Sequence, residues 1–265
     1  MNSSISIPHS DALNWILGPV CDAVSYVAEE AKLAGLIHRG LGVLENQDAF
    51  LVLAKDKFLE EGMDDMASKV AHLLRGAGAL RRMSKEVRDA DFAQVGAHSL
   101  VGTWCALEVA VEDTVVLVLV KEADGLSRIK NEGVKTGGLE EGPLSEEDAR
   151  RMYSRFERKA RAEKYVGEAY AYMLGVMGLD VSVSRHVPSK LHEINAVRNC
   201  ILHRGGIIDD RAADSVGALR SYRGRKFDIG VEKYREYHGA VGDFLQAMLH
   251  GVLKSTFIRG REDER

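Results

Sequence analysis

Thr114-Val-Val-Leu-Val-Leu-Val120 is the stretch that decides the fold class, because it suits either a buried strand or part of a long helix. β-Branched residues favour strands, and a short apolar run does not settle the choice by itself. The residues around it favour a helix, because one apolar stripe continues at three- and four-residue spacing through Trp104, Leu107, Val111, Val115 and Val118. We therefore expect a helix over about 91–122.

The rest of the chain is also typical of helices. Only four prolines occur in 265 residues, and proline is the strongest helix breaker. The segment 123–143 is rich in glycine and indicates a linker, and Ser145 to Asp148 indicates a capping box that opens the next helix. The sequence therefore predicts an all-α fold with these further helices: about 11–37 with an interruption near Gly18-Pro19, 47–61, 64–88, 146–175, 188–203 and 231–255.

Composition excludes several classes of protein. Hydrophobic residues make up 45% of the chain and charged residues 29%, which excludes disordered, collagen-like and disulfide-scaffold chains. No apolar run is long enough to span a bilayer, and the first residues lack the features of a secretory signal. Three widely spaced cysteines (Cys21, Cys105 and Cys200) favour reduced thiols. We expect a cytoplasmic protein with no membrane partner.

Charge is distributed unevenly along the chain. Residues 1–66 contain 4 basic and 11 acidic residues, a net charge of −7, although the whole chain carries only −4. Seven basic residues lie within 148–164, and a second basic cluster occupies 222–226. These clusters are either solvated helix faces or a surface that follows nucleic-acid phosphates, and the sequence leaves both interpretations open.

Common catalytic and cofactor motifs are absent from the sequence. The chain has no GxxxxGK[ST] phosphate loop, no CxxC pair and no HExxH motif, and Gly76-Ala-Gly78 does not follow a strand. Cys200 and His203 have a spacing that suits a metal, but no second pair of ligands accompanies them. We therefore expect neither a metal site nor a cofactor.

The segment Ile194-Asn-Ala-Val-Arg-Asn-Cys-Ile-Leu-His-Arg-Gly-Gly-Ile-Ile-Asp-Asp210 holds the candidate chemistry. On a helical wheel, an apolar stripe is formed by Val187, Leu191, Ile194, Val197 and Ile201, and Asn199 and His203 fall on the opposite face. Asn199 and His203 are four residues apart and are therefore neighbours. The glycines at 205 and 206 indicate the end of the helix, where the helix dipole favours an imidazolium.

Arg198 lies at the edge of the apolar stripe, about 140° around an ideal helix from His203. A common site for both residues therefore needs an unwound helix end, an arginine side chain that wraps around the helix, or a second copy of the chain. Alternatively, Arg198 is structural and pairs with a core carboxylate, such as Glu108 or Asp113. Glu193 is a weaker candidate for orienting Arg198.

These residues resemble the HEPN superfamily, whose signature is an arginine, four to six further residues and a histidine, often with asparagine after the arginine. Ile207-Ile-Asp209 resembles the turn that follows this motif, and Ser99–Glu108 resembles the earlier core helix. The resemblance covers about residues 90–265. It implies an HEPN-like helical bundle (90–265) preceded by an N-terminal helical extension (1–89).

The resemblance also implies a function. HEPN proteins of this kind are metal-independent endoribonucleases, in which the 2′-OH of single-stranded RNA attacks the adjacent phosphorus and leaves a 2′,3′-cyclic phosphate and a 5′-OH. The implied catalytic residues are Arg198, Asn199 and His203, and the nearby basic residues Arg204, Arg223, Arg225 and Lys226 are candidates for RNA binding. The family implies a homodimer in which two motifs line one cleft, and a role in toxin–antitoxin systems or antiviral defence.

Two other interpretations remain. HEPN-like bundles without activity exist, so the chain can also be a non-catalytic dimeric interaction module or a nucleotide-binding module. The N-terminal extension can serve as a sensor or as the binding segment for an antitoxin or regulatory protein. The acidic balance of the chain and the position of Arg198 favour the non-catalytic module, whereas an Arg-Asn-x-x-x-His set favours the enzyme.

Overall fold

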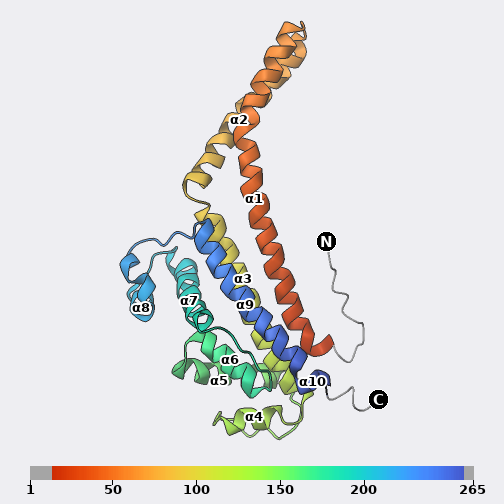
Figure 1. Cartoon of the computed structure of the whole chain (residues 1–265), viewed down its shortest axis with the longest axis vertical. Helices are drawn as coiled ribbons and strands as arrows, with labels where there is room; N and C mark the ends of the chain where they lie inside the picture. Colours follow the sequence, from red (N-terminus) through yellow and green to blue (C-terminus); the bar gives the residue numbers. More distant parts are fainter. Residues whose placement is uncertain (1–13, 260–265) are drawn as a thin grey trace. The chain divides into compact units, whose positions relative to one another are not determined.

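The computed structural model describes residues 14–259, and every regular element in this range is a helix (Figure 1). The elements are α1 (Asn14–Glu60), α2 (Asp64–Asp89), α3 (Ala93–Lys121), α4 (Gly125–Asn131), α5 (Glu146–Glu163), α6 (Val166–Val176), α7 (His186–Arg204), α8 (Asp210–Ser215), the 3-10 helix η1 (Gly217–Tyr222), α9 (Val231–Lys254) and α10 (Thr256–Arg259). No strand or sheet occurs within residues 14–259, so the prediction of an all-α fold is confirmed.

Helix α3 contains the whole of Thr114–Val120, which confirms the helical interpretation of that stretch. The five side chains of the predicted stripe are completely buried. Thr114, Val116 and Leu119 are buried too, so this part of α3 is enclosed around most of its circumference. Burial on this scale outweighs the small helix-propensity cost of β-branched residues, which is at most about 0.7 kcal/mol each.

The chain forms two compact units, each assembled from segments that are distant in sequence. The larger unit contains the residues up to Ala28, Val101–Phe227 and the residues from Glu236 onward. The smaller unit contains Glu29–Leu100 and Asp228–Arg235. Three of the four boundaries thus fall within α1, α3 and α9, and the fourth lies after Phe227 in the segment before α9. The sequence-based division at residue 89 stays a prediction.

The core of the larger unit is built on aromatic side chains from three helices. The Tyr170 ring of α6 lies 6.4 Å from the Trp104 ring of α3 and 6.5 Å from the Phe244 ring of α9, measured between centroids. Helices α6 and α7 meet at Gly167, where a Cβ atom would lie 2.7 Å from the Cα of Pro188. Glycine is needed at this position because any side chain would separate the two helices.

Helix α1 differs from the sequence-based prediction. It is continuous from Asn14 to Glu60, so the expected interruption near Gly18-Pro19 and the separate helix at 47–61 are wrong. Pro19 lies within the second turn and removes one intrahelical bond, the one to the carbonyl of Trp15, which a helix of this length tolerates. The expected start near Asp11 lies outside the described residues.

In the smaller unit, the later part of α1 and α2 form an antiparallel hairpin (Figure 1). Ion pairs join Asp48 to Arg81 and Glu45 to Arg88, each at 2.5 Å. No residue of α1 from position 29 to position 60 is buried, and the side chain of Phe50 is 71% exposed. The hairpin therefore has little buried core along α1.

The regions between the long helices also differ from prediction. The expected linker 123–143 contains α4, the expected helix 146–175 is divided at Lys164 and Tyr165, and neither α8 nor η1 was expected. Segments of six or seven residues are too short to show a helical period. The predicted cap is confirmed, because the Ser145 Oγ accepts a hydrogen bond from the backbone N–H of Asp148 at 3.2 Å. None of the described helices is long and apolar enough to cross a membrane.

Candidate active site

Helix α7 carries the candidate motif and packs one face into the larger unit. Four residues of the predicted apolar stripe (Val187, Leu191, Ile194 and Val197) are buried, and Ile201 is half-buried. The helix ends as predicted: Gly205 adopts a left-handed conformation with φ of 60°, and the N–H of Gly206 donates to the Cys200 carbonyl at 3.0 Å. The motif therefore lies in the last two turns of a well-anchored helix.

Arg198 is the best-connected member of the motif. Its Nη2 donates to the Glu108 Oε2 on α3 at 2.9 Å, and its Nη1 donates to the Asn199 Oδ1 at 3.0 Å. Its Nε is buried and has no hydrogen-bond partner among the described residues. Of the two carboxylates considered from sequence, Glu108 is the one that pairs with Arg198, whereas Asp113 pairs with Arg150 at 3.2 Å.

Glu108 belongs to a larger charge network between α3 and α5. Its Oε1 lies 3.7 Å from the Arg161 Nη2, and the Arg161 Nε lies 3.2 Å from the Glu157 Oε1. Burial raises the pKa of the Glu157 carboxyl above its ordinary value. Glu108 thus lies between two guanidinium groups, and it keeps one of them if the other is removed.

Asn199 and His203 occupy the more open side of the helix end. Asn199 is half-buried and is held by the hydrogen bond from Arg198. His203 is exposed and forms no hydrogen bond, ion pair or ring contact within the described part of the chain. Because Asn199 and His203 are one turn apart on α7, they occupy neighbouring positions on the same side of the helix.

The structure excludes one of the three routes by which Arg198 and His203 could share a site. Helix α7 is unbroken to Arg204, so the helix end does not unwind. The Arg198 side chain bonds to Glu108 on α3 and to its sequence neighbour Asn199, and no contact among the described residues joins it to His203, so the route through a wrapped side chain stays a prediction. The route through a second copy of the chain stays a prediction.

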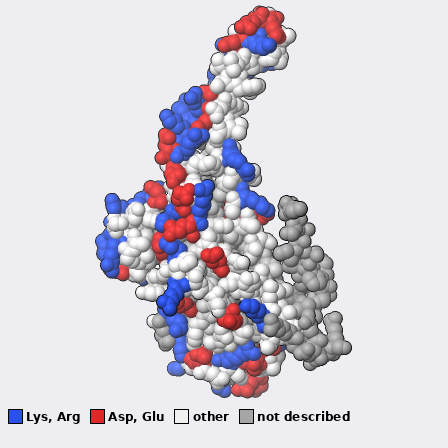
Figure 2. Space-filling model, viewed as in Figure 1, with Lys and Arg blue, Asp and Glu red and all other residues white. Residues whose placement is uncertain are grey.

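The segment after α7 brings the second basic cluster back to the motif. Backbone hydrogen bonds join the two stretches: the Ile208 N–H donates to the Arg225 carbonyl at 3.0 Å, and the Phe227 N–H donates to the Gly206 carbonyl at 2.9 Å. Isolated bridges pair Ile207 with Lys226 and Ile208 with Arg223. In Figure 2, Lys and Arg side chains gather at the edge of the molecule where Figure 1 shows α8.

The four predicted RNA-contacting residues have different surroundings. Arg204 is exposed and has no polar partner among the described residues. Arg223 pairs with two carboxylates of α8, Asp210 at 2.7 Å and Asp214. Arg225 donates to the Ser221 carbonyl and lies 5.7 Å from the centroid of the Tyr222 ring, and Lys226 is exposed. The charge of Arg223 is therefore largely neutralised, whereas Arg204 has no carboxylate partner among the described residues.

Glu193, the weaker candidate for orienting Arg198, contacts a different set of residues. Its buried carboxylate accepts hydrogen bonds from the Tyr237 hydroxyl and from the Lys190 Nζ, both at 2.7 Å. Lys190 also reaches Glu236 at 2.5 Å. This network joins α7 to α9, and no pattern in the sequence predicted it.

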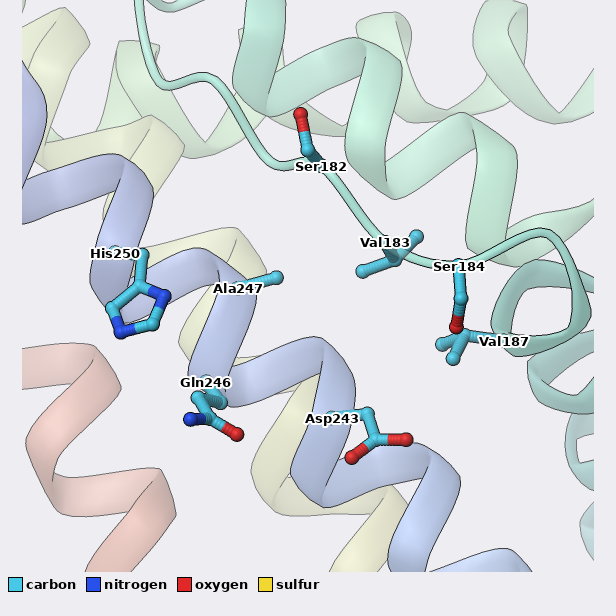
Figure 3. Close-up of a pocket in the computed structure, with 8 residues that line it drawn as sticks. All are labelled: Ser182, Val183, Ser184, Val187, Asp243, Gln246, Ala247 and His250. Atoms are coloured by element: carbon cyan, nitrogen blue, oxygen red, sulfur yellow. The ribbon is translucent and has the colours of Figure 1, made fainter.

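A separate pocket lies between α9 and the loop before α7. Its polar lining includes Ser182, Ser184, Asp243, Gln246 and His250. Figure 3 shows Asp243, Gln246 and His250 one after another along α9, with the Ser182 hydroxyl pointing away from them. No hydrogen bond joins any two of these side chains within the described residues.

No cluster of three or more His, Cys, Asp or Glu side chains that could hold a metal ion occurs among residues 14–259. No protein-family model matches the chain, and no curated protein and no solved structure matches it either.

Proposed function

We propose that this chain is an HEPN-type endoribonuclease that cleaves single-stranded RNA without a metal ion. The observation that carries the proposal is the row of polar groups at the end of α7, in which Arg198 donates to Asn199 and Asn199 lies one turn from the exposed His203. The resemblance of the 194–210 segment to HEPN proteins supports the same assignment. Such an enzyme acts on cytoplasmic RNA.

The residue types suit RNA cleavage by its own 2′-OH. The reaction needs a base that takes the proton of the 2′-OH, an acid that protonates the departing 5′-oxygen, and positive charge near the phosphorane. The exposed imidazole of His203 can exchange protons with a bound substrate and with water. The guanidinium of Arg198 supplies N–H donors for phosphoryl oxygens, and Asn199 fixes the direction of that guanidinium.

In this proposal a second copy of the chain completes the site. One imidazole cannot serve as base and acid at opposite sides of the phosphorus at the same moment. Two copies of His203 in a homodimer divide these roles, and the two sets of Arg204 and Lys226 supply exposed positive charge for the RNA backbone. An antitoxin or other regulatory protein would act by covering the site that the two copies of His203 form.

The competing function is a non-catalytic interaction module, and one observation favours it. The Arg198–Glu108 ion pair, at 2.9 Å, satisfies much of the charge of the arginine without any substrate. A purely structural arginine would have this environment. The two functions differ in what His203 does: in the enzyme it transfers protons, whereas in a structural module it is a solvated surface side chain.

The experiment compares the wild-type chain with His203→Ala on an end-labelled single-stranded RNA in EDTA. His186→Ala is the matched control, because His186 is also exposed and lies at the opposite end of α7. We expect cleavage to fall by about 10²–10⁴-fold in His203→Ala and to stay unchanged in His186→Ala. Products should carry a 2′,3′-cyclic phosphate, and a DNA of the same sequence should stay intact because it lacks the 2′-OH.

Growth of cells that express the chain gives an independent readout of the implied defence role. Wild-type protein should arrest growth, and His203→Ala should not. Equal cleavage by wild type and a folded His203→Ala would contradict the catalytic assignment. Absence of cleavage by wild-type dimers would move the function to the interaction module.

A further inference from the structure

The glycine-rich loop after α4 and the basic face of α5 line an open pocket of about 510 Å³ within the larger unit. Its lining consists of Gly133, Val134, Lys135, Gly137, Arg155 and Lys159. Three of these six residues are cations and none is a carboxylate. We propose that this pocket binds the phosphate group of a small phosphorylated molecule, such as a nucleotide.

The charges of α5 are divided between two sets of residues. Arg150, Arg151 and Arg161 form ion pairs with carboxylates of α3 and α5. Arg155 and Lys159 form no ion pair with any carboxylate among the described residues, and neither does Lys135 on the loop. Three cations without a carboxylate partner, two from α5 and one from the loop, therefore line one pocket, whereas Arg158, which also forms no ion pair among the described residues, lies outside it.

The loop is shaped around these cations. A Cβ atom at Gly133 would lie 3.0 Å from the Lys159 Nζ, and one at Gly137 would lie 3.0 Å from the Arg155 Nη1. Both glycines have positive φ, 74° and 70°, which other residues rarely adopt. Lys159 donates to the Glu132 carbonyl and Arg155 to the Lys135 carbonyl at 3.1 Å, so each cation is held in place by a single backbone oxygen.

Backbone donors of the same loop are also unused. The amides from Lys135 to Gly138 donate no hydrogen bond within the described residues. Consecutive free amides at a glycine-rich turn, together with Lys and Arg side chains, are the groups with which proteins bind phosphate. The adjoining cavity of about 130 Å³ shares Gly137 and Arg155 and contains one carboxylate, Asp148, which Ser145 already binds at 2.7 Å.

The size of the pocket favours a small molecule over a bare anion. Pockets for small ligands have volumes of about 300–1,000 Å³, and a phosphate alone occupies a small part of such a space. The phosphate end of the ligand should lie against Arg155 and Lys159, and the rest of the ligand should lie toward Val134. Arg198, Asn199 and His203 are not part of the lining, so this site is independent of RNA cleavage.

Isothermal titration of the full chain with AMP, inorganic phosphate and adenosine tests the proposal. AMP and phosphate should bind with millimolar affinity or better, AMP more tightly, and adenosine should not bind. Lys135→Gln is the main variant, because the Lys135 side chain is exposed and bonds to nothing among the described residues, so its loss leaves the loop intact. It should weaken AMP binding about tenfold, the effect of losing one charged contact.

Arg158→Gln is the matched control, since Arg158 is an exposed arginine of α5 outside the lining. Its affinity for AMP should equal that of the wild type, and Arg155→Gln should reduce binding at least as much as Lys135→Gln does. Three outcomes would overturn the proposal: no binding of AMP or phosphate, binding that Lys135→Gln leaves unchanged, or binding of a short RNA at this site without binding of AMP. Loss of RNA cleavage in His203→Ala would not alter any of these results.

Discussion

Replacing Arg198 and Glu108 by glutamine, singly and together, separates a structural arginine from a catalytic one. The two side chains are 19% and 27% exposed, and their hydrogen bond is charge-assisted. Such a bond contributes about 1.5–3 kcal/mol when buried, and partial exposure to solvent reduces this value. We therefore expect a coupling free energy of about 1–2 kcal/mol from the double-mutant cycle.

The single variants should lose less stability than a buried orphan charge would imply. Glu108 keeps Arg161 at 3.7 Å when Arg198 is replaced, so its carboxylate is not left without a cation. Each single variant should cost about 1–2 kcal/mol, which corresponds to about 2–4 °C in Tm per kcal/mol for a chain of this size. Urea unfolding followed by tryptophan fluorescence measures these values, because both tryptophans, Trp15 and Trp104, belong to the larger unit.

Cleavage by the same variants gives the decisive comparison. Glutamine at position 108 still offers an oxygen to the Arg198 guanidinium, so Glu108→Gln should retain cleavage within about tenfold. Arg198→Gln removes the charge and should lower cleavage by about 10²-fold or more while the chain stays folded. A coupling energy below about 0.5 kcal/mol would refute the stabilising ion pair. If cleavage by Arg198→Gln and by Glu108→Gln falls only as much as the fraction of folded protein falls in each variant, Arg198 is not catalytic.

Three further predictions concern the framework. Gly251→Ala should destabilise the chain by about 1–3 kcal/mol, because the new Cβ would lie 2.7 Å from the Asp180 carbonyl oxygen. Gly239→Ala in the same helix meets nothing within 4 Å and should be neutral or stabilising, and thermal melts compare the two variants. Burial lowers the pKa of His192 below its ordinary value, so the unfolded chain binds more protons at this residue than the folded chain does. The free energy of unfolding should therefore fall as the pH drops below about 6.5. This part of the pH dependence should disappear in His192→Gln, and an unchanged slope of stability against pH in that variant would contradict the assignment. Backbone amides of α1 between positions 36 and 60 should exchange hydrogen faster than those of the second half of α3, as hydrogen-exchange mass spectrometry can establish, because no side chain of that α1 segment is buried.

Regular periodicity made the long helices predictable. The stripe of α3 and the cap at Ser145 are local patterns, and both have the predicted geometry. The continuity of α1 was not predictable from local rules, because they treat Pro19 as a break although a proline near a helix start removes only one hydrogen bond. The turn between α7 and α9 depends on backbone pairing of residues 206–208 with 223–227, which has no sequence period.

The partner of Arg198 shows a different limit of sequence analysis. Glu108 and Asp113 are both on α3 and are five residues apart, so they face different directions on the helix. Which of them meets Arg198 depends on the rotation of α3 against α7, and this rotation is set by core side chains from several helices. The sequence therefore narrowed the partner to two carboxylates, and the packing selected Glu108.

Several parts of the 198–210 segment have an identifiable structural role. Arg198 joins α7 to α3, and Gly205 and Gly206 adopt φ values of 60° and 87° that end the helix. The Asp209 Oδ1 accepts from the Ala212 N–H at 2.9 Å and so begins α8. His203 lies between these anchors, is exposed, and has no hydrogen bond, ion pair or ring contact in the described chain. Because the fold around it is held by its neighbours, a substitution at His203 changes the chemistry of the helix end with little effect on stability, and that makes it the residue on which the ribonuclease proposal depends.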